Sequence, residues 1–495
     1  MGRLFVDGPD GASPCGCGRA EPLGAAKGGR QGQGGRRGRG TTTDEAERSR
    51  RGPVVSISRR TFLAATCATP WALPAVHAGG RAPANERITV GIVGLGSRGF
   101  NLIDALLSEA DAQIVAICDV DALHYRDQPW GKGRAYGRQP AQQRIDSRYA
   151  PKGRTDSGGV AVYRDYRDLC RHEDLDAVVV ATPDHWHALV ALESLRAGCH
   201  VYCEKPITHR FAEGVRLCEE VERRKAVFQV GSQQRSDARF RRAVEIVRNG
   251  HLGEIQRVEV GLPSGYEHAQ GDTRITAPPD HLDYDLWCGP APRLPYMRAR
   301  HHRWWRGHSA FGGGVLMDWI GHHNDIAQWG LGMERSGPLE VEALDWAPSK
   351  TEVYDTPWHY TIRCRYAGGV ITTISDGNAM GVRWIGSDGW LYVRRGKWQA
   401  SRAEWLEPDF KVGSWRLPKI ASHMRNFLDG IRSHEECTAP PDIALRSITP
   451  GFLGYVSWKL GRPLRWDAKA QRVEGDAEAD RQLREVTYRS PWKLG

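Results

Sequence analysis

The sequence has no uninterrupted apolar run of the length that a membrane-spanning helix needs, which is about 20 residues. The mildly apolar stretch at residues 63–73 is short, Pro70 interrupts it, and Pro74 follows directly. We therefore expect no stable membrane insertion.

The sequence also lacks a dense basic segment beyond its N-terminal region. The net charge is +10, but residues 1–78 contain 12 Lys or Arg and 6 Asp or Glu, which leaves a surplus of only +4 for the rest. Nucleic-acid-binding domains are far more basic, so a nucleic-acid partner is not expected.

Cysteine is sparse and shows no disulfide pattern. Eight of the 11 cysteines follow residue 78, several of them in apolar runs, where a free cysteine packs as a small apolar side chain. Cys199 and Cys203 alternate with Val201 on an expected strand, which favours core packing over metal binding. No metal site is predicted.

Residues 58–78 have the pattern of an export signal. Ser58-Arg59-Arg60-Thr61-Phe62-Leu63 is a twin-arginine motif, and the small residues near Ala78 suggest cleavage after it. This pattern predicts export by the twin-arginine machinery to the periplasm or another compartment outside the cytoplasm. A chance Arg-Arg pair in a basic tail is the alternative.

Residues 1–57 are a low-complexity leader rich in Gly and Arg. Because a twin-arginine motif normally lies close to the start of a chain, we expect translation to begin near Val54 or Val55. A peptide from residues 1–50 in the unprocessed precursor would refute that expectation.

A glycine-rich turn stands where an apolar strand, residues 88–93, gives way to helical spacing at 100–107. In such a turn, free backbone N–H groups and the positive helix end favour a pyrophosphate, which predicts dinucleotide binding. We expect the first glycine to permit the tight turn, the second to let the backbone approach the phosphates, and the third to let the helix pack on the strand. The turn consists of Gly94, Leu95, Gly96, Ser97, Arg98 and Gly99.

A second apolar run, residues 112–118, ends in Asp119. A carboxylate at that distance binds the adenosine ribose hydroxyls and repels a 2′-phosphate, which favours NAD over NADP. The alternative is a glycine turn in an unrelated α/β protein.

The pattern along the chain predicts an α/β protein. Residues 86–206 alternate strand-like and helix-like stretches, which predicts an N-terminal Rossmann domain with a doubly wound parallel sheet. Residues 207–464 begin with helices and continue with β-rich runs, which predicts a C-terminal α/β domain with an open, mainly antiparallel sheet. Residues 465–495 are interpreted as a polar surface tail, and residues 125–159 as a surface insertion.

Two segments at the expected carboxyl edge of the first sheet contain residues that suit a nicotinamide site. Lys205 follows a strand directly, between Glu204 and Pro206, and Glu204 can orient the lysine or the nicotinamide ribose. The preceding strand ends in a Thr-Pro turn that should face the same crevice. From this turn we assign three further cofactor-binding residues: Thr182, Pro183 and His187. The alternative for Lys205 is a solvated lysine at a strand end.

A third segment, residues 312–323, contains an acid and two histidines. On a helix over 315–329, Asp318 and His322 lie one turn apart, and a carboxylate beside an imidazole can tune it to exchange protons near neutral pH. A structural Asp–His hydrogen bond is the alternative. A metal site that includes His323 and Asp325 is disfavoured because adjacent histidines point in different directions on a helix.

Tryptophan outnumbers phenylalanine, 18 to 10, and several aromatic residues stand beside hydrogen-bond donors at 300–306. Flat faces together with donors suit a sugar, so we assign substrate binding to four residues: Trp304, Trp305, Arg306 and His323. The alternative is that these tryptophans fill core or dimer contacts.

With these segments, the chain resembles the glucose–fructose oxidoreductase, inositol dehydrogenase and rhizopine-catabolism (Gfo/Idh/MocA) family, and in particular its secreted twin-arginine members. The matching segments are GLGSRG at 94–99, ATPDHWHA at 181–188, Glu204-Lys205-Pro206, RNGHLGEI at 247–254 and GGGVLMDWIGHH at 312–323.

The resemblance extends over residues 88–494. It implies homodimers or homotetramers formed through the C-terminal sheet, a lysine at 205 that touches both nicotinamide and substrate, and a catalytic group completed by Asp318 and His322. The chain has Asp184 where many relatives have Asn, and His323 follows His322; both affect the polarity of the substrate pocket.

These features predict an NAD-dependent oxidoreductase that acts on a hydroxyl of a sugar, polyol or glycoside. One alternative is an NAD-dependent enzyme that cleaves glycosides through transient oxidation, because a carbonyl acidifies the neighbouring C–H bond. The other is a non-catalytic, nucleotide-loaded sugar-binding protein.

Overall fold

The computed structural model describes residues 86–126, 133–150 and 159–495. The leader and the predicted export signal lie outside the described residues. No helix in the described part is both long and apolar enough to cross a membrane.

The first sheet is parallel and has six strands, in the order β5-β2-β1-β6-β7-β8. The strands are β1 (Ile88–Val93), β2 (Ala112–Cys118), β5 (Ala161–Tyr163), β6 (Ala177–Val180), β7 (His200–Cys203) and β8 (Phe228–Val230). Along β6, Val178 and Val180 belong to one core while Ala177 and Val179 belong to another. Successive side chains therefore face two different helical layers.

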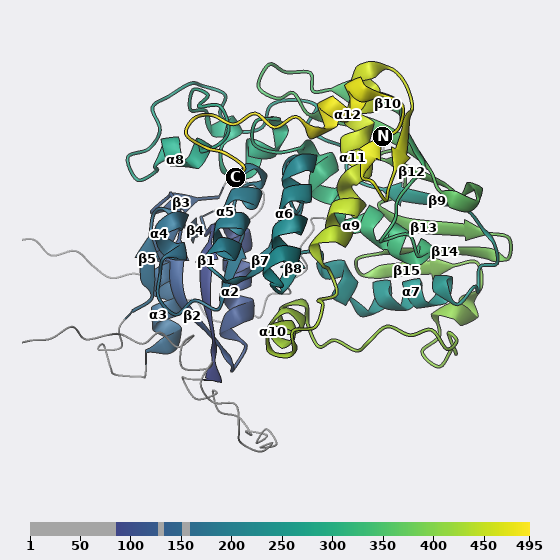
Figure 1. Cartoon of the computed structure of the whole chain (residues 1–495), viewed down its shortest axis with the longest axis horizontal. Helices are drawn as coiled ribbons and strands as arrows, with labels where there is room; N and C mark the ends of the chain where they lie inside the picture. Colours follow the sequence, from purple (N-terminus) through teal and green to yellow (C-terminus); the bar gives the residue numbers. More distant parts are fainter. Residues whose placement is uncertain (1–85, 127–132, 151–158) are drawn as a thin grey trace, which may run out of the picture. The chain divides into compact units, whose positions relative to one another are not determined.

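Helices cover both faces of this sheet. One layer contains α2 (Ser97–Leu107) and α3 (Arg138–Tyr149), and the other contains α4 (Tyr166–Cys170), α5 (Asp184–Arg196) and α6 (Phe211–Arg224). Figure 1 shows α5 and α6 beside β7. The predicted doubly wound parallel sheet is confirmed.

The boundary placed at residue 206 is wrong, because two later elements belong to the first sheet and its core. Strand β8 pairs in parallel with β7. Helix α10 (His423–Ser433) packs Met424, Phe427 and Leu428 into the same core as β1. The segment interpreted as a surface insertion contains α3, whose Ala141 and Ile145 are buried, and a short hairpin of β3 (His124–Tyr125) and β4 (Ala135–Tyr136).

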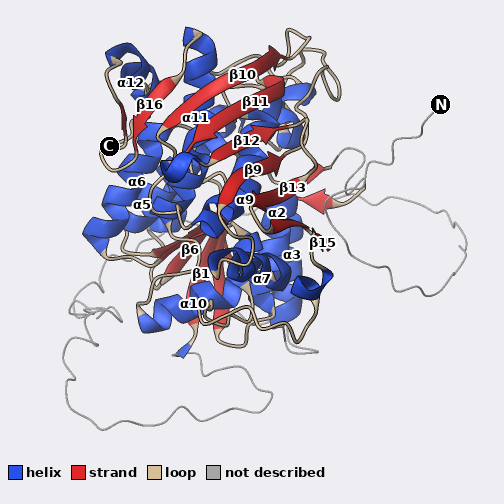
Figure 2. Cartoon of the chain, turned by 90° about the vertical axis from the view of Figure 1, so that its right-hand side faces the viewer, coloured by secondary structure: helices blue, strands red, loops and turns tan. Residues whose placement is uncertain are grey.

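The second sheet has nine strands in the order β15-β14-β13-β9-β12-β11-β10-β16-β17, and Figure 2 shows its central strands side by side. Its pairs are antiparallel except β12 with β9, which confirms the predicted mainly antiparallel sheet. The strands are β9 (Ile255–Gly261), β10 (Glu340–Pro348), β11 (Pro357–Arg365), β12 (Ile371–Ser375), β13 (Gly381–Gly386), β14 (Gly389–Arg394), β15 (Lys397–Ala400), β16 (Leu464–Asp467) and β17 (Arg472–Val473).

Helices pack on this sheet and join it to the first. The main ones are α7 (Ala238–Arg248), α9 (Gly314–Leu331) and α11 (Pro441–Leu460). Helix α9 contacts β9, β11 and β13, so its residues lie between the sheet and the remaining helices. Shorter helices are η2 (Gln233–Ser236), α8 (Tyr284–Cys288), η3 (Arg298–Arg300), η4 (His302–Gly307), η5 (Ala367–Gly369) and η6 (Ala403–Leu406).

The interpretation of residues 465–495 as a surface tail is also wrong in part. Strand β16 pairs with β10 and buries Trp466, and α12 (Ala477–Arg484) packs against α6 and α11. The polar composition of residues 465–495 suggested a surface tail because only one face of each short element is buried, and the other face is polar.

Candidate active site

The glycine turn between β1 and α2 has the geometry of a phosphate cradle. Gly94 has φ +94°, and a Cβ there would lie 2.5 Å from the carbonyl carbon of Ala181. A Cβ on Gly99 would lie 2.1 Å from the oxygen of Gly94, so the helix packs directly on the turn. A Cβ on Gly96 would meet no atom of the described residues within 4 Å. Open space therefore faces the N-terminus of α2, which fits a pyrophosphate.

Substitutions at Gly94 and Gly96 should separate folding from cofactor binding. Gly94→Ala forces a side chain into a left-handed conformation and against Ala181, so the free energy of unfolding should fall by about 2 kcal/mol or more. Gly96→Ala adds a methyl group to open space, so stability should hold while the Kd for NAD rises about tenfold or more. Calorimetric titration with NAD and urea-induced unfolding measure the two effects. Unchanged NAD affinity in Gly96→Ala would contradict the cradle.

Asp119 stands at the end of β2, and its carboxylate also holds the glycine turn in place. Oδ2 accepts the backbone N–H of Leu95 at 2.6 Å, and Oδ1 accepts that of Asp121 at 2.9 Å. Burial raises the pKa of Asp119 to about 6. The predicted ribose-binding residue therefore lies next to the cradle and fixes its backbone.

Arg98, in the glycine turn, forms an ion pair with Glu204. Arg98 Nε donates to Glu204 Oε1 at 2.8 Å, and Gln233 donates to the same oxygen at 3.0 Å. Burial alone would raise the pKa of Glu204, but Arg98 and then Lys205 lower it, so the group is a carboxylate near neutral pH. Ser97 receives a hydrogen bond from Arg126, which sequence reasoning did not single out.

The Thr-Pro turn follows β6, and Pro183 precedes the first residue of α5. Thr182 Oγ1 is buried and has no partner among the described residues. The ring nitrogens of His187 lie 2.7 Å from the carbonyl oxygen of Pro206 and 3.0 Å from that of Thr182. The ring of His187 thus links the Thr-Pro turn to the turn at Pro206, and its assignment to cofactor binding stays a prediction.

Lys205 and Asp318 come together, as the resemblance to the Gfo/Idh/MocA family implies. Lys205 Nζ lies 2.5 Å from Asp318 Oδ1 and donates to the backbone oxygen of Asp318 at 3.0 Å. Arg306 Nε lies 3.0 Å from the same Oδ1. Burial would raise the pKa of Asp318, but Arg306 and Lys205 lower it to about 2. One carboxylate is thus shared by two cations.

His322 has a different partner from the one expected. The carboxylate of Asp318 is engaged by Lys205 and Arg306, while His322 Nε2 lies 3.2 Å from a guanidinium nitrogen of Arg395. His322 Nδ1 is buried without a partner among the described residues. Burial, then the charges of Lys205 and Arg395, lower the pKa of His322 well below its usual value, so the imidazole is neutral.

Arg395 is a site residue that the sequence analysis missed. It lies in the turn between β14 and β15, and its guanidinium stacks 5.2 Å from the ring centre of Trp319. An arginine in a hairpin turn has no sequence signal that distinguishes it from a solvated one, so only the fold reveals its position.

Three of the four predicted substrate-binding residues are buried. Trp305 belongs to a small core with Trp287 and Phe311. Trp304 is buried beside Tyr266. The third is His323 of α9, whose Nδ1 lies 2.7 Å from the carbonyl oxygen of Gly261. Trp305 thus fits the alternative of core packing, the assignment of Trp304 and His323 to substrate binding stays a prediction, and Arg306 alone of the four reaches the Lys205 network.

Asp184 is a buried acid beside the same network. Neither of its carboxylate oxygens has a hydrogen-bond partner in the described part of the chain. Burial raises the pKa of Asp184 to about 7, although the charges of Arg306 and Lys205 oppose the rise. This carboxyl therefore changes its protonation near neutral pH.

Stability should depend on pH through Asp184. Its pKa is higher in the folded protein than in the unfolded chain, where it is about 4, so the stabilising contribution is complete at low pH and is lost as pH rises toward 7. The amide in Asp184→Asn mimics the neutral acid, so the free energy of unfolding of this variant should exceed that of the wild type by about 4 kcal/mol at pH 8 and nearly match it at pH 4. Urea-induced unfolding across this range measures the difference. Asp168→Asn, at an exposed carboxyl, is the control and should follow the wild type.

The chain matches two family models that together extend over most of the described residues. The model of the oxidoreductase family's NAD-binding Rossmann fold matches residues 88–232, and that of its C-terminal alpha/beta domain matches 237–494.

Curated relatives match a shorter part. The inositol 2-dehydrogenase of Salmonella typhimurium (strain LT2) is 29% identical over 169 residues, which is 34% of this chain and 43% of the relative. A glycosyl hydrolase family 109 protein of Shewanella sp. (strain MR-4) is 26% identical over 175 residues, which is 35% of this chain and 34% of the relative. The chain thus covers less than half of the length of these relatives.

Solved structures share the fold over most of the chain. The WlbA dehydrogenase of Bordetella pertussis, in complex with NADH and UDP-GlcNAcA, has a TM-score of 0.53 and 20% identity, over 77% of this chain and 98% of that one. The aldose-aldose oxidoreductase of Caulobacter crescentus, complexed with glycerol, has a TM-score of 0.54 and 16% identity, over 77% and 99%. The family models, together with the cradle at Gly96, show that this chain belongs to the NAD-binding oxidoreductases of the Gfo/Idh/MocA family.

Proposed function

We propose that the protein is an NAD-dependent oxidoreductase that transfers a hydride between nicotinamide and a hydroxyl-bearing carbon of a sugar, polyol or glycoside. The contact of Lys205 with Asp318 is the observation that carries this proposal. It joins the carboxyl edge of the NAD-binding sheet to helix α9, so charged groups from both halves of the chain meet beside the cofactor-binding turns. The names of the inositol dehydrogenase and aldose oxidoreductase relatives support a polyhydroxylated substrate.

The residues have distinct parts in this reaction. Asp318, ionised and shared with Arg306, holds the Lys205 ammonium group in place. Lys205 stabilises the negative charge that develops on the substrate oxygen. His322, which is neutral, accepts the hydroxyl proton at Nε2 when the substrate hydroxyl takes the place of the Arg395 N–H. Bound NAD supplies the nicotinamide carbon that accepts or returns the hydride.

The test is a single-turnover measurement on the purified protein with NAD bound. A panel of aldoses, polyols and glycosides is mixed in, and nicotinamide absorbance and product mass are recorded. At least one compound should reduce the nicotinamide and lose two hydrogens. Stoichiometric binding of a sugar with no nicotinamide reduction anywhere on the panel would contradict the proposal and favour the sugar-binding alternative.

Glycoside cleavage is the second candidate function, because one relative is named as a glycosyl hydrolase family 109 protein. The same hydride transfer would then be transient: oxidation of a sugar carbon acidifies the neighbouring C–H bond, and return of the hydride after elimination leaves no net redox change. Released aglycone with unchanged total NADH would distinguish cleavage from net oxidation.

Export and assembly belong to the same proposal. We propose that the twin-arginine machinery exports the folded protein with NAD bound, and that this bound cofactor is oxidised and reduced in turn without leaving the protein. We also propose that the chain forms a homodimer or homotetramer. N-terminal sequencing of the mature protein should begin at Gly79. Native mass spectrometry should show retained NAD in an assembly of two or four chains; a monomer without nucleotide would contradict this proposal.

A further inference from the structure

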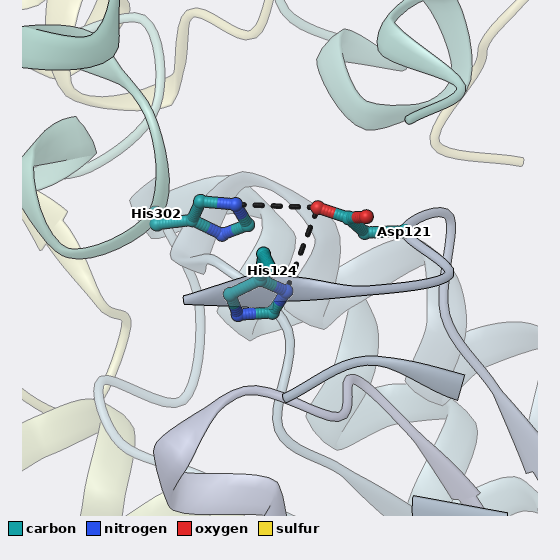
Figure 3. A group of neighbouring side chains, drawn as sticks. All are labelled: Asp121, His124 and His302. Carbon is teal, nitrogen blue, oxygen red and sulfur yellow. Dashed lines mark ion pairs between the residues drawn. The ribbon is translucent and has the colours of Figure 1, made fainter. Parts of the chain in front are cut away.

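Two histidines converge on one carboxylate oxygen away from the Lys205 network. Asp121 Oδ2 lies 3.5 Å from His124 Nδ1 and 3.2 Å from His302 Nε2 (Figure 3). Asp121 follows β2, His124 belongs to β3, and His302 begins η4, so residues nearly 180 positions apart supply the group. Within the described residues, these three form the one group with ligand atoms close enough to share an ion.

The cluster is buried and its inner atoms are not otherwise satisfied. The exposed fractions of Asp121 and His124 are 1% and 9%. Among the described residues, Asp121 Oδ2 and His124 Nδ1 have no hydrogen-bond partner. Buried polar atoms without partners are costly, and an ion that binds both removes that cost.

A second layer of contacts orients the carboxylate. His281 Nδ1 lies 2.8 Å from Asp121 Oδ1, and the backbone N–H of Leu123 donates to the same oxygen at 3.2 Å. Both contacts use Oδ1 and leave Oδ2 turned toward His124 and His302. An oriented carboxylate of this kind is typical of metal ligands and their supporting contacts.

The two distances from Asp121 Oδ2 to the histidine nitrogens fit the edges of a tetrahedral site. With metal–nitrogen and metal–oxygen bonds of about 2.0–2.2 Å, neighbouring ligand atoms in a tetrahedral zinc site stand about 3.3–3.5 Å apart. The Oδ2 distances of 3.2 and 3.5 Å match this edge length. The imidazoles of His124 and His302 are stacked, with ring centres 3.7 Å apart and planes 17° apart, so at least one ring must rotate substantially before both in-plane lone pairs point at one ion.

We propose that Asp121, His124 and His302 bind a divalent transition-metal ion, with water completing the coordination. Two imidazoles and one carboxylate suit zinc or iron(II) and disfavour calcium and magnesium, which prefer oxygen ligands. The nearby positive charge of Arg298 opposes the ion and limits its affinity.

The ion would connect two parts of the nucleotide-binding region to the catalytic network. The backbone N–H of Asp121 donates to the carboxylate of Asp119, which also holds the glycine turn in place. His302 begins the 3₁₀ helix that ends beside Arg306, the partner of Asp318. Its φ of +46°, rare for a residue other than glycine, is held by the contacts of the segment. The ion therefore acts as a structural link that positions Arg306, and it takes no part in the chemical step.

The test is calorimetric titration of the full-length protein with zinc chloride after treatment with EDTA and removal of the chelator. The wild type should bind one zinc per chain and gain several degrees in melting midpoint. Asp121→Asn and His302→Gln should each weaken binding at least about 100-fold, and His281→Ala about 10-fold. His434→Asn, at an exposed histidine of the α10 C-terminus, is the matched control and should bind like the wild type.

Two results would overturn the site. The first is that the wild-type protein binds less than one zinc ion per chain at zinc concentrations that saturate typical protein zinc sites. The other is an Asp121→Asn variant that binds zinc as tightly as the wild type. Because the isosteric amide preserves the shape of Asp121, circular dichroism should show a folded variant, and the wild-type titration does not depend on any variant.

Discussion

Replacing Lys205 by alanine is expected to lower kcat by about 10²–10³-fold, because the ammonium group is the cation best placed to stabilise charge on the substrate oxygen. Folding should survive, since Asp318 keeps its contact with Arg306. NAD should still bind, because the glycine turn is untouched. The measurement is steady-state turnover on whichever substrate the single-turnover panel identifies, together with NAD titration.

The matched control is Lys459→Ala, at an exposed lysine near the end of α11, which should keep full activity. Asp318→Asn should also lower kcat, because it removes the negative charge that holds Lys205 in position. Undiminished turnover in Lys205→Ala would remove this residue from the mechanism.

Loss of the buried ion pair between Arg235 and Asp325 is expected to give the largest effect on stability. Arg235 Nε and one terminal nitrogen donate to the two carboxylate oxygens at 2.7 and 2.9 Å, and both side chains are 2% exposed. Asp325→Ala leaves a buried guanidinium without its counter-charge, so the free energy of unfolding should fall by about 3–5 kcal/mol. Urea-induced unfolding provides the measurement.

Two comparisons make this prediction specific. The double variant Arg235→Met with Asp325→Leu should recover most of the loss, because no charge is then left buried. Breaking the exposed pair of Arg171 and Asp168 with Asp168→Ala should cost no more than about 1 kcal/mol. A loss below 1 kcal/mol in Asp325→Ala would show that water reaches Arg235 in solution.

Local patterns predicted much of the fold. Strands β1 and β2 have the bounds of the apolar runs at 88–93 and 112–118, and the glycine turn stands between β1 and α2. The domain boundary was not predictable in the same way, because β8 and α10 join the first sheet and its core through contacts between distant residues. The sequence of a short strand or amphipathic helix does not by itself indicate which of two hydrophobic cores the element packs against.

The site shows the same division. The meeting of Lys205 with Asp318 was implied by the family resemblance of their two segments, not by the local pattern of either one. The partner of His322 did not, since Arg395 arrives from a hairpin that is distant in sequence. Similarly, the side chains of Trp305 and His323 are of types that can bind a sugar. In the fold, however, Trp305 packs in a small apolar core, and His323 contacts a backbone carbonyl oxygen.

The position of α10 limits how this protein can be recombined with its relatives. A fragment ended after residue 232 would expose the apolar surface against which Phe427 and Leu428 pack. Chimaeras that exchange the nucleotide-binding half between homologous enzymes should therefore transplant residues 423–433 together with 88–232, even though nearly 200 residues separate the two segments along the polypeptide.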